Sequence, residues 1–240
     1  MEFKHHLSDP EIEKTIPASL DYVEKYYKVN EEAKYHYFRL MQFRKKVSDI
    51  FSSEYLKEIY LTLIDWGMNS RVAKLADENT FISSVQSYSH LIEKLRDLRI
   101  ESLSVSELED SLSIIDKLFR CMELVAEGKP PLVTFSKTMH FLIPDLFTPM
   151  DRTYTMCFFF GSTTLNNKMY RVDTFKSLFM EFYEYSHNNY SLNNYLGDGW
   201  NGSIPKIMDN IIIGYLSTNN LKCDKRNKSR YPASSVLEAV

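Results

Sequence analysis

The amino-acid sequence predicts an all-α, multi-helix globular protein, and three observations support this prediction. Only seven of the 240 residues are glycine, whereas β folds and βαβ units use many glycines in turns and at strand-to-helix joints. Apolar residues recur every three or four positions along most of the chain, which is the spacing of one helix face. Several segments also begin with a capping sequence and end at glycine or proline. We therefore expect about nine or ten helices.

The composition is that of an ordinary globular protein. Hydrophobic residues make up 44% and charged residues 25%, which is too apolar for a disordered chain. The length suits one large domain or two helical lobes. We expect a helical domain over 1–218, built as two lobes with a cleft between them, in which 105–165 form one lobe. A basic, polar tail is expected over 219–240.

The apolar spacing also places the individual helices. In chain order they are predicted over 10–16, 19–28, 31–51, 53–66, 77–95, 105–127, 132–142, 152–160, 172–187 and 204–216. Ser8 and Ser104 each stand three residues before a glutamate, which is the spacing of a capping box. Pro17 is expected to end the first helix. Residues 188–202 are rich in Asn, Tyr and Gly and are expected to form a loop.

Several classes of function are not expected from this sequence. Neither GxxxxGK[ST] nor HExxH is present, so we expect no nucleotide, metal or other cofactor. Cys121, Cys157 and Cys223 are scattered and form no CxxC pair, so we expect no disulfide framework. The polar residues 1–20 do not read as a signal peptide, and no uncharged apolar run approaches the ~18 residues of a membrane span. We expect a cytoplasmic monomer.

Charge is unevenly distributed along the chain, whose net charge is −3. Residues 1–119 carry 16 Lys and Arg against 21 Asp and Glu, whereas residues 120–176 carry 7 against 5. Strong nonspecific DNA binding needs many cations that neutralise phosphates, so the acidic whole argues against it. A local basic face in the middle of the chain remains compatible with the sequence.

The segment 135–152 is the basis of the functional prediction. Ser136 and Lys137 lie on a short apolar helix, a turn bounded by two prolines follows, and Asp151 stands at the start of a very apolar helix. An aspartate in this place caps the free helix amides. The same fixed carboxylate could activate water or stabilise a positively charged sugar. The structural alternatives are a solvated helix-end lysine for Lys137 and a packed or surface histidine for His140.

This segment resembles the active-site region of the helix-hairpin-helix DNA glycosylases. The similarity covers about residues 128–160 and rests on Ser136-Lys137, the apolar run, Pro149 and Asp151. It differs from the family in residues 129–134, where the hairpin glycines are not evident, and in having no four-cysteine cluster. The resemblance implies that Asp151 is the catalytic aspartate and that Lys137 falls near the nucleophilic lysine.

The resemblance also implies a reaction. A damaged or modified base would be flipped into a pocket. The base could belong to damaged cellular DNA, as in repair, or to the modified DNA of a phage, as in a defence function. Asp151 would stabilise the oxocarbenium-like sugar and orient water. Lys137, as an amine, could form a Schiff base and nick the strand.

Other residues are candidates for contacts with DNA. Stacking, base-edge and phosphate contacts are predicted for Trp66, Asn69, Arg71, Arg152, Lys168, Arg171, Trp200 and Asn201. The structural alternatives are a helix C-cap with a buried Trp near residue 66, an ordinary connection near residue 200, and solvated surface charges for the cations.

Two other functions fit the same sequence. The first is a non-catalytic helical module that binds nucleic acid or protein, which the acidic N-terminal half and the missing hairpin glycines favour. The second is a hydrolase that uses Asp151 with His140, for which no Ser or Cys nucleophile motif is present. Replacing Asp151 by Asn would leave the binding module intact and abolish turnover by a glycosylase.

Overall fold

The computed structural model confirms the all-α fold class. It describes residues 3–27, 31–69, 74–163, 166–221 and 223. Within these ranges no strand occurs, and the β contacts are isolated bridges. Most of the tail expected over 219–240 lies outside the described residues.

The described ranges contain ten α-helices and several short turns of other helix types. The α-helices are α1 (Pro10–Tyr26), α2 (Glu31–Lys46), α3 (Ser53–Leu63), α4 (Glu78–Ser87), α5 (Ser89–Ile92), α6 (Val105–Cys121), α7 (Leu132–Leu142), α8 (Thr155–Phe160), α9 (Val172–Asn188) and α10 (Ile204–Thr218). The π turn is η1 (Ile64–Met68), and the 3₁₀ turns are η2 (Glu93–Leu95), η3 (Ile100–Ser102), η4 (Asn166–Tyr170), η5 (Tyr190–Tyr195) and η6 (Gly199–Asn201).

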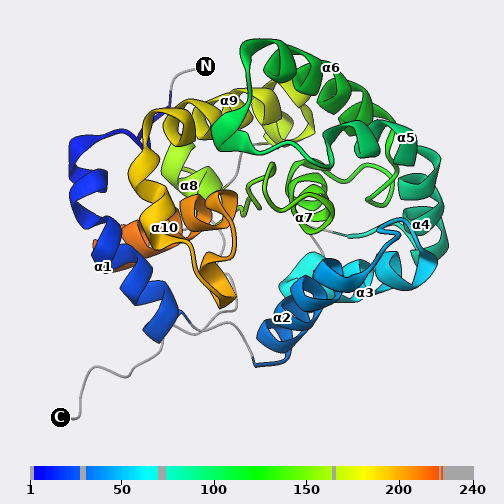
Figure 1. The fold of residues 1–240 in the computed structure, drawn as a ribbon, viewed down its shortest axis with the longest axis horizontal. Helices are drawn as coiled ribbons and strands as arrows, with labels where there is room; N and C mark the ends of the chain where they lie inside the picture. Colours follow the sequence, from blue (N-terminus) through cyan, green and yellow to red (C-terminus); the bar gives the residue numbers. More distant parts are fainter. Residues whose placement is uncertain (1–2, 28–30, 70–73, 164–165, 222, 224–240) are drawn as a thin grey trace.

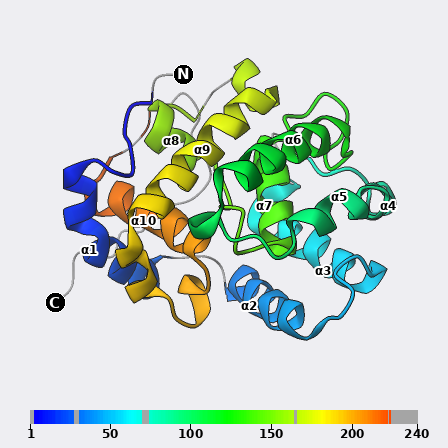
Figure 2. The ribbon, with the colours of Figure 1, turned by 45° about the horizontal axis from the view of Figure 1, so that its top comes forward.

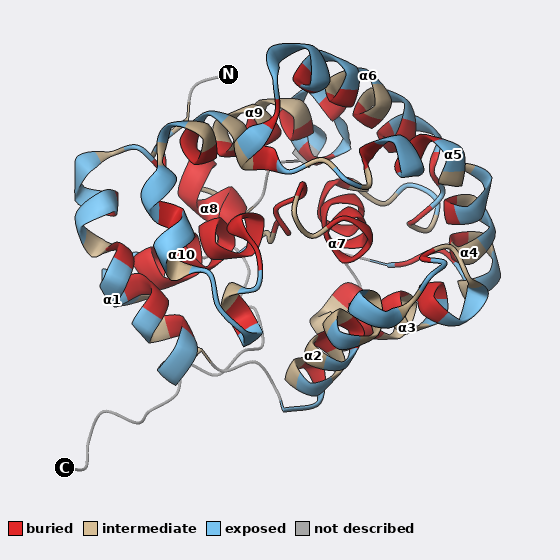
Figure 3. Ribbon diagram, viewed as in Figure 1, coloured by how far each residue is buried: buried red, intermediate tan, exposed pale blue. Residues whose placement is uncertain are grey.

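The helices form two groups around α7 (Figures 1 and 2). One group contains α2 to α6, and the other contains α8, α9 and α10 together with α1 from the opposite end of the chain. α1 packs along α10, and α6 packs against α9. α7 contacts α2 and α3 and is buried along its whole length, as Figure 3 shows. Residues of α7 therefore lie where the two groups meet.

Several predicted helix ends are confirmed by their hydrogen bonds. Ser104 Oγ accepts from the Glu107 amide at 3.3 Å, while the Glu107 carboxylate accepts from the Ser104 amide at 2.8 Å. This is the reciprocal capping box that the sequence predicted. Asp77 caps α4 by accepting from the Thr80 amide at 3.1 Å. Gly161 closes α8 with a φ of 65°, a left-handed conformation that favours glycine.

Other predicted boundaries are wrong. Pro17 lies inside α1 instead of ending it, and the helix begins after Asp9 with no capping box at Ser8. A proline removes one helix hydrogen bond, but α1 also buries an apolar face, and α10 packs along this helix. That burial offsets the lost bond. The expected loop at 188–202 contains the 3₁₀ turns η5 and η6.

The scattered cysteines led us to expect no disulfide framework, but two of the three form a single disulfide. Cys157 in α8 and Cys223 beyond α10 form a disulfide, with their Cα atoms 5.7 Å apart. Because α8 packs against α10, the fold brings together two residues that are 66 positions apart in sequence. Spacing along the chain alone could not show this pairing. Cys121 is free and exposed.

At Gly214 the backbones of α10 and α1 approach each other closely. A Cβ atom built on Gly214 would overlap the backbone of Ser19, which cannot move aside as a flexible side chain can. We expect Gly214→Ala to lower the free energy of unfolding by about 1–3 kcal/mol through overpacking. Denaturant unfolding followed by circular dichroism measures this loss.

Gly197→Ala is the matched control for this substitution. A Cβ atom at Gly197 has no heavy atom within 4 Å, so we expect a change below about 0.5 kcal/mol. Equal losses at Gly197 and Gly214 would contradict the close backbone contact between the two helices.

Candidate active site

Lys137 and Asp151 form an ion pair where the two groups of helices meet. Lys137 Nζ lies 3.6 Å from Asp151 Oδ2. The side chain of Lys137 is only 7% exposed, whereas that of Asp151 is 36% exposed. Lys137 lies in the middle of α7, not at its start, so it is not a solvated lysine at a helix end. The pair therefore combines a covered ammonium with a carboxylate that reaches solvent.

Hydrogen bonds to the following turn hold Asp151 in place. Its Oδ1 accepts from the amides of Thr153 at 2.6 Å and Tyr154 at 3.3 Å. Its own amide donates to the Thr155 hydroxyl at 2.9 Å. The carboxylate thus caps the turn before α8, because the helix itself begins at Thr155 and not at Arg152. With Oδ1 occupied by amides, Oδ2 faces Lys137.

Ser136 connects α7 to the turn that carries Asp151. Its hydroxyl accepts from the Met150 amide at 3.0 Å and donates to the Val133 carbonyl at 2.9 Å. Ser136 is fully buried, so this contact is shielded from water. Lys137 and Asp151 are therefore held close together, because Ser136 ties α7 to Met150 and the amides of Thr153 and Tyr154 hold the Asp151 carboxylate.

An aromatic stack lies against Lys137. Its Nζ is 5.1 Å from the ring centroid of Trp66, within the range of a cation–π contact. The Tyr37 ring stacks on Trp66 at 5.3 Å with 24° between the planes, and on Trp200 at 4.9 Å with 18°. Trp66 and Trp200 are the two tryptophans of the chain. The stack joins α2, η1 and η6.

A second and more deeply buried ion pair lies at the other end of the stack. Lys206 Nζ is 2.6 Å from Asp209 Oδ2, 2.8 Å from Asn210 Oδ1 and 5.1 Å from the Trp200 ring centroid. The side chains of Lys206 and Asp209 are 3% and 7% exposed. Two buried charges are retained here although their desolvation is costly.

The two ion pairs lie within electrostatic reach of each other. Burial raises the pKa of the Asp209 carboxyl, and the adjacent Lys206 ammonium opposes that shift. The Asp151 carboxylate raises the same pKa further, and the Lys137 ammonium lowers it. The two ion pairs, the aromatic stack between them and Asn210 are called the cluster below. Removing one of its charges changes the electrostatic free energy of the remaining charged side chains.

Asn210 ties the second pair to the turn that carries Trp200. Its Nδ2 donates to the Trp200 carbonyl at 2.8 Å and to Asn201 Oδ1 at 2.9 Å. Asn201 and Trp200, both predicted from the Gly-rich segment, therefore belong to the cluster. Trp200 is buried, so η6 is a packed element and not an ordinary connection.

His140 is a packed histidine, which is one of the two structural alternatives. It is fully buried, and its Nδ1 is 2.8 Å from the Phe147 carbonyl. Burial lowers the pKa of His140 to about 3, so the ring is neutral at pH 7. Because a carbonyl only accepts, Nδ1 carries the proton. These contacts give no support to a hydrolase that uses His140 as its base.

The remaining predicted DNA contacts lie outside this cluster. Asn69 is exposed and bridges to Lys74, and Arg71 lies outside the described residues. The three predicted phosphate contacts have local partners: Arg152 donates to the Thr163 carbonyl at 2.9 Å, Lys168 lies 5.1 Å from the Phe160 ring, and Arg171 pairs with Asp173 at 3.1 Å.

Four residues of the cluster were missed by the reasoning from sequence. Lys206, Asp209 and Asn210 interrupt an otherwise apolar helix, and charged residues inside an apolar helix are a signal that could have been used. Tyr37 gives no comparable signal, because it reads as one more aromatic residue on a helix face.

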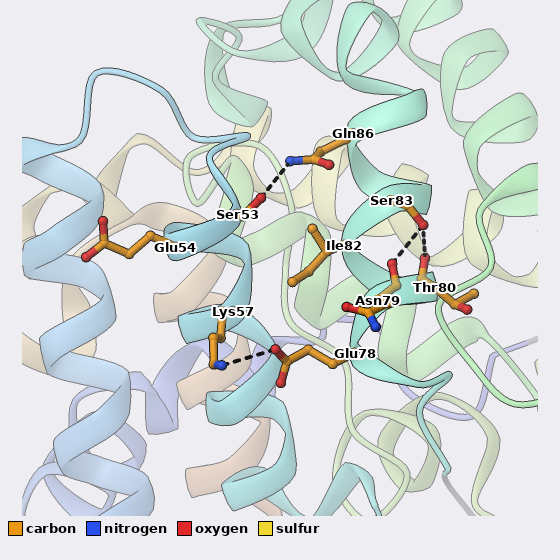
Figure 4. A pocket seen from close by; sticks show the side chains of 9 residues that line it. All are labelled: Ser53, Glu54, Lys57, Glu78, Asn79, Thr80, Ile82, Ser83 and Gln86. Carbon is orange, nitrogen blue, oxygen red and sulfur yellow. Dashed lines mark hydrogen bonds and ion pairs between the residues drawn. The ribbon is translucent and has the colours of Figure 1, made fainter.

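Two surface hollows lie away from the cluster. One of about 750 Å³ lies between α3 and α4, and its polar lining includes the Lys57–Glu78 ion pair at 3.2 Å (Figure 4). The other, of about 700 Å³, includes Asn69 and Lys74. Neither contains Lys137 or Asp151, so the cleft between lobes stays a prediction. We take the two ion pairs as the candidate site, because they combine lysines, carboxylates and aromatic rings, whereas in the first hollow Lys57 pairs with Glu78 and Gln86 with Ser53.

The chain matches no protein family, no curated protein sequence and no solved structure. None of the helices in the described ranges is both long and apolar enough to cross a membrane. Within the same ranges, no three His, Cys, Asp or Glu residues gather as metal ligands would. The function of this chain is therefore inferred from the geometry of the two ion pairs and the aromatic stack between them.

Proposed function

We propose that this protein is a DNA glycosylase that excises a damaged or modified base. The observation that supports the proposal most is the 3.6 Å contact between Lys137 Nζ and Asp151 Oδ2. These are the two residues for which the sequence resemblance implies catalytic roles. A nucleophile and a carboxylate within reach of each other are what covalent catalysis at a sugar carbon needs.

In the proposed reaction the C1′–N bond breaks, and its electron pair leaves with the base. The sugar develops positive charge, which the Asp151 carboxylate stabilises. In the hydrolytic route water adds to C1′, Asp151 accepts the proton of that water, and the base departs after taking up a proton. This hydrolysis consumes one water molecule and needs no redox partner or cofactor.

In the lyase route Lys137 replaces water. Its ammonium passes a proton to Asp151, and the free amine attacks C1′ as the base leaves. The resulting aminal opens to a Schiff base, from which the strand can be cleaved. The surroundings of Lys137 fit this role, because Trp66 covers the ammonium while Asp151 remains open to solvent.

Arg152 and Lys168 are the proposed phosphate contacts, one at each end of α8. Arg152 follows Asp151 directly, Lys168 lies against Phe160 at the end of α8, and neither pairs with a carboxylate within the described ranges. We expect the Arg152→Ala/Lys168→Ala variant to bind DNA more weakly and to lower the slope of log affinity against log salt by about 1–2. Fluorescence anisotropy at several salt concentrations measures both.

Lys57→Ala is the control for this prediction. Lys57 lies on α3, away from α8, and already pairs with Glu78 at 3.2 Å. Its loss should leave the salt slope unchanged. If the slope of log affinity against log salt is the same for wild type and the Arg152/Lys168 variant, these two residues do not contact DNA phosphates.

The alternative function is a non-catalytic helical module that binds nucleic acid or protein. The observation that favours it is the closure of the site, since the Lys137 side chain is 7% exposed. Such a module would bind its partner without breaking a bond.

Base release separates the two functions. Purified protein is incubated with DNAs that carry alkylated, oxidised or deaminated bases and with phage DNA that contains modified cytosines, and free bases are identified by mass spectrometry. A glycosylase releases one class of base and leaves abasic sites. Binding without release on every DNA would favour the non-catalytic module.

A further inference from the structure

Tyr37 occupies a slot between the two tryptophans of the chain. Its ring lies nearly parallel to both indoles, with centroid distances of 5.3 Å to Trp66 and 4.9 Å to Trp200. The two indoles come from distant segments of the sequence, η1 and η6. A ring held in this way makes the contacts that a planar heterocycle makes between two aromatic side chains.

The surroundings of Tyr37 are polar as well as aromatic. Burial raises the pKa of the Tyr37 hydroxyl, and the negative charge of Asp209 raises it further. Asp209 pairs at 2.6 Å with Lys206, whose Nζ lies 5.1 Å from the ring centroid of Trp200, one wall of the slot. The His140 ring lies parallel to Tyr37 with centroids 6.4 Å apart. His140 Nε2 is a buried acceptor that has no hydrogen-bond partner within the described ranges. The slot thus combines aromatic walls with buried donors and acceptors.

We propose that this slot is the base-binding subsite, that Tyr37 fills it in the free protein, and that Lys206 and Asp209 recognise the polar edge of the base that replaces Tyr37. This inference rests on the proposed function, because it supplies the pocket that base excision needs. It is consistent with the position of Lys137, whose Nζ lies 5.1 Å from the centroid of one wall of the slot, Trp66.

The two buried charges select a class of base. Lys206 only donates hydrogen bonds, and the Asp209 carboxylate only accepts them. A guanine edge presents one acceptor, O6, beside two donors, N1–H and N2–H, so that a carboxylate takes both donors as a fork while the ammonium takes O6. Adenine and cytosine each offer the carboxylate one donor group. The subsite therefore fits a 2-amino-6-oxopurine, including its oxidised or alkylated forms.

Tryptophan fluorescence reports this slot directly, because both tryptophans of the chain are its walls. Tyr37→Ala vacates the slot, and Tyr37→Phe keeps it filled. We expect deoxyguanosine to quench the fluorescence of Tyr37→Ala with an affinity about tenfold or more above that for wild type or Tyr37→Phe, since the resident ring no longer competes. No quenching of Tyr37→Ala by deoxyguanosine would overturn the proposal.

The recognition of the edge is tested with related nucleosides. Deoxyadenosine should bind Tyr37→Ala about tenfold or more weakly than deoxyguanosine, and deoxyinosine, which lacks the 2-amino group, should fall between them. Adding Asp209→Asn should remove most of this preference while quenching persists. Equal affinities for all three nucleosides, or a preference that survives Asp209→Asn, would overturn the assignment of Asp209.

A wild-type measurement covers the case in which Tyr37→Ala fails to fold, as judged by circular dichroism. Millimolar deoxyguanosine, but not deoxyadenosine, should then raise the Tm of wild type, and the absence of any difference would overturn the proposal. Failure of the proposed function is read separately from base release. Nucleoside binding with no base release on any DNA would support the subsite but contradict the glycosylase function. Base release without a guanine preference would support the glycosylase function but contradict the subsite.

Discussion

Asp151→Asn is expected to lower the rate of base release by at least about 10²-fold while the protein stays folded. The amide can still accept the hydrogen bonds from the Thr153 and Tyr154 amides that Oδ1 accepts in the wild type. What disappears is the negative charge at Oδ2, 3.6 Å from Lys137 Nζ. Without it the positive sugar is not stabilised and no carboxylate takes the proton from water or from Lys137. Single-turnover base release measures the loss.

Asp145→Asn is the control, because Asp145 belongs to the same connection between α7 and α8. Its side chain is 43% exposed and pairs with Arg99 at 3.8 Å, away from Lys137. We expect wild-type rates for this variant. Comparable rates for Asp151→Asn and wild type would exclude Asp151 from the chemistry.

Lys206→Met is expected to lower the free energy of unfolding by about 3–5 kcal/mol. The substitution leaves the Asp209 carboxylate buried, without the ammonium that lies 2.6 Å away in the wild type. Asn210 also loses the donor to its Oδ1, and the contact to the Trp200 ring is lost. Denaturant unfolding at pH 7 measures the effect.

Lys25→Met provides a control matched in distance but not in burial. Lys25 pairs with Asp21 at the same 2.6 Å, yet both side chains are more than half exposed. Exposed pairs contribute little to stability, so we expect no measurable loss. The double variant Lys206→Met/Asp209→Leu should recover much of the stability lost in Lys206→Met, since it leaves no unpaired charge. A loss in Lys206→Met no larger than that in Lys25→Met would contradict the buried pair.

The stability of Lys206→Met should also depend on pH with a defined sign. Burial raises the pKa of Asp209 in the folded protein, above the value of about 3.9 in an unfolded chain. A group with a raised folded pKa contributes stability that is fully present below the unfolded pKa and is lost as pH rises through the folded pKa. The deficit of Lys206→Met relative to wild type should therefore shrink as pH falls from neutral towards 4.

Local features of the fold could be predicted from the sequence. The capping box at Ser104 and the bounds of α7 depend on neighbouring residues, and both agree with the structure. The continuation of α1 through Pro17 depends on packing against α10, and the Cys157–Cys223 disulfide depends on the contact of α8 with α10. Contacts between distant segments decide these features, and periodicity along one segment does not report them.

The same distinction applies to the candidate site. Lys137 and Asp151 could be singled out because an unusual segment carries both, and the structure places them 3.6 Å apart. Trp66 and Trp200 could be named singly, but their shared contact with Tyr37 arises only in the tertiary structure. Lys206 could have been noted as a charge inside an apolar helix, but its contact with Trp200 could not have been predicted from the sequence.

The measurement that tests the central claim most directly is borohydride trapping on DNA that carries the released base. Borohydride reduces a Schiff base to a stable amine, and peptide mapping then names the lysine that is bound to the DNA. We predict abasic sites together with an adduct at Lys137, both lost in Asp151→Asn, and an adduct lost in Lys137→Gln but kept in Lys176→Gln. An adduct at another lysine, or abasic sites that persist in Asp151→Asn, would contradict the Lys137–Asp151 pair as the reactive centre.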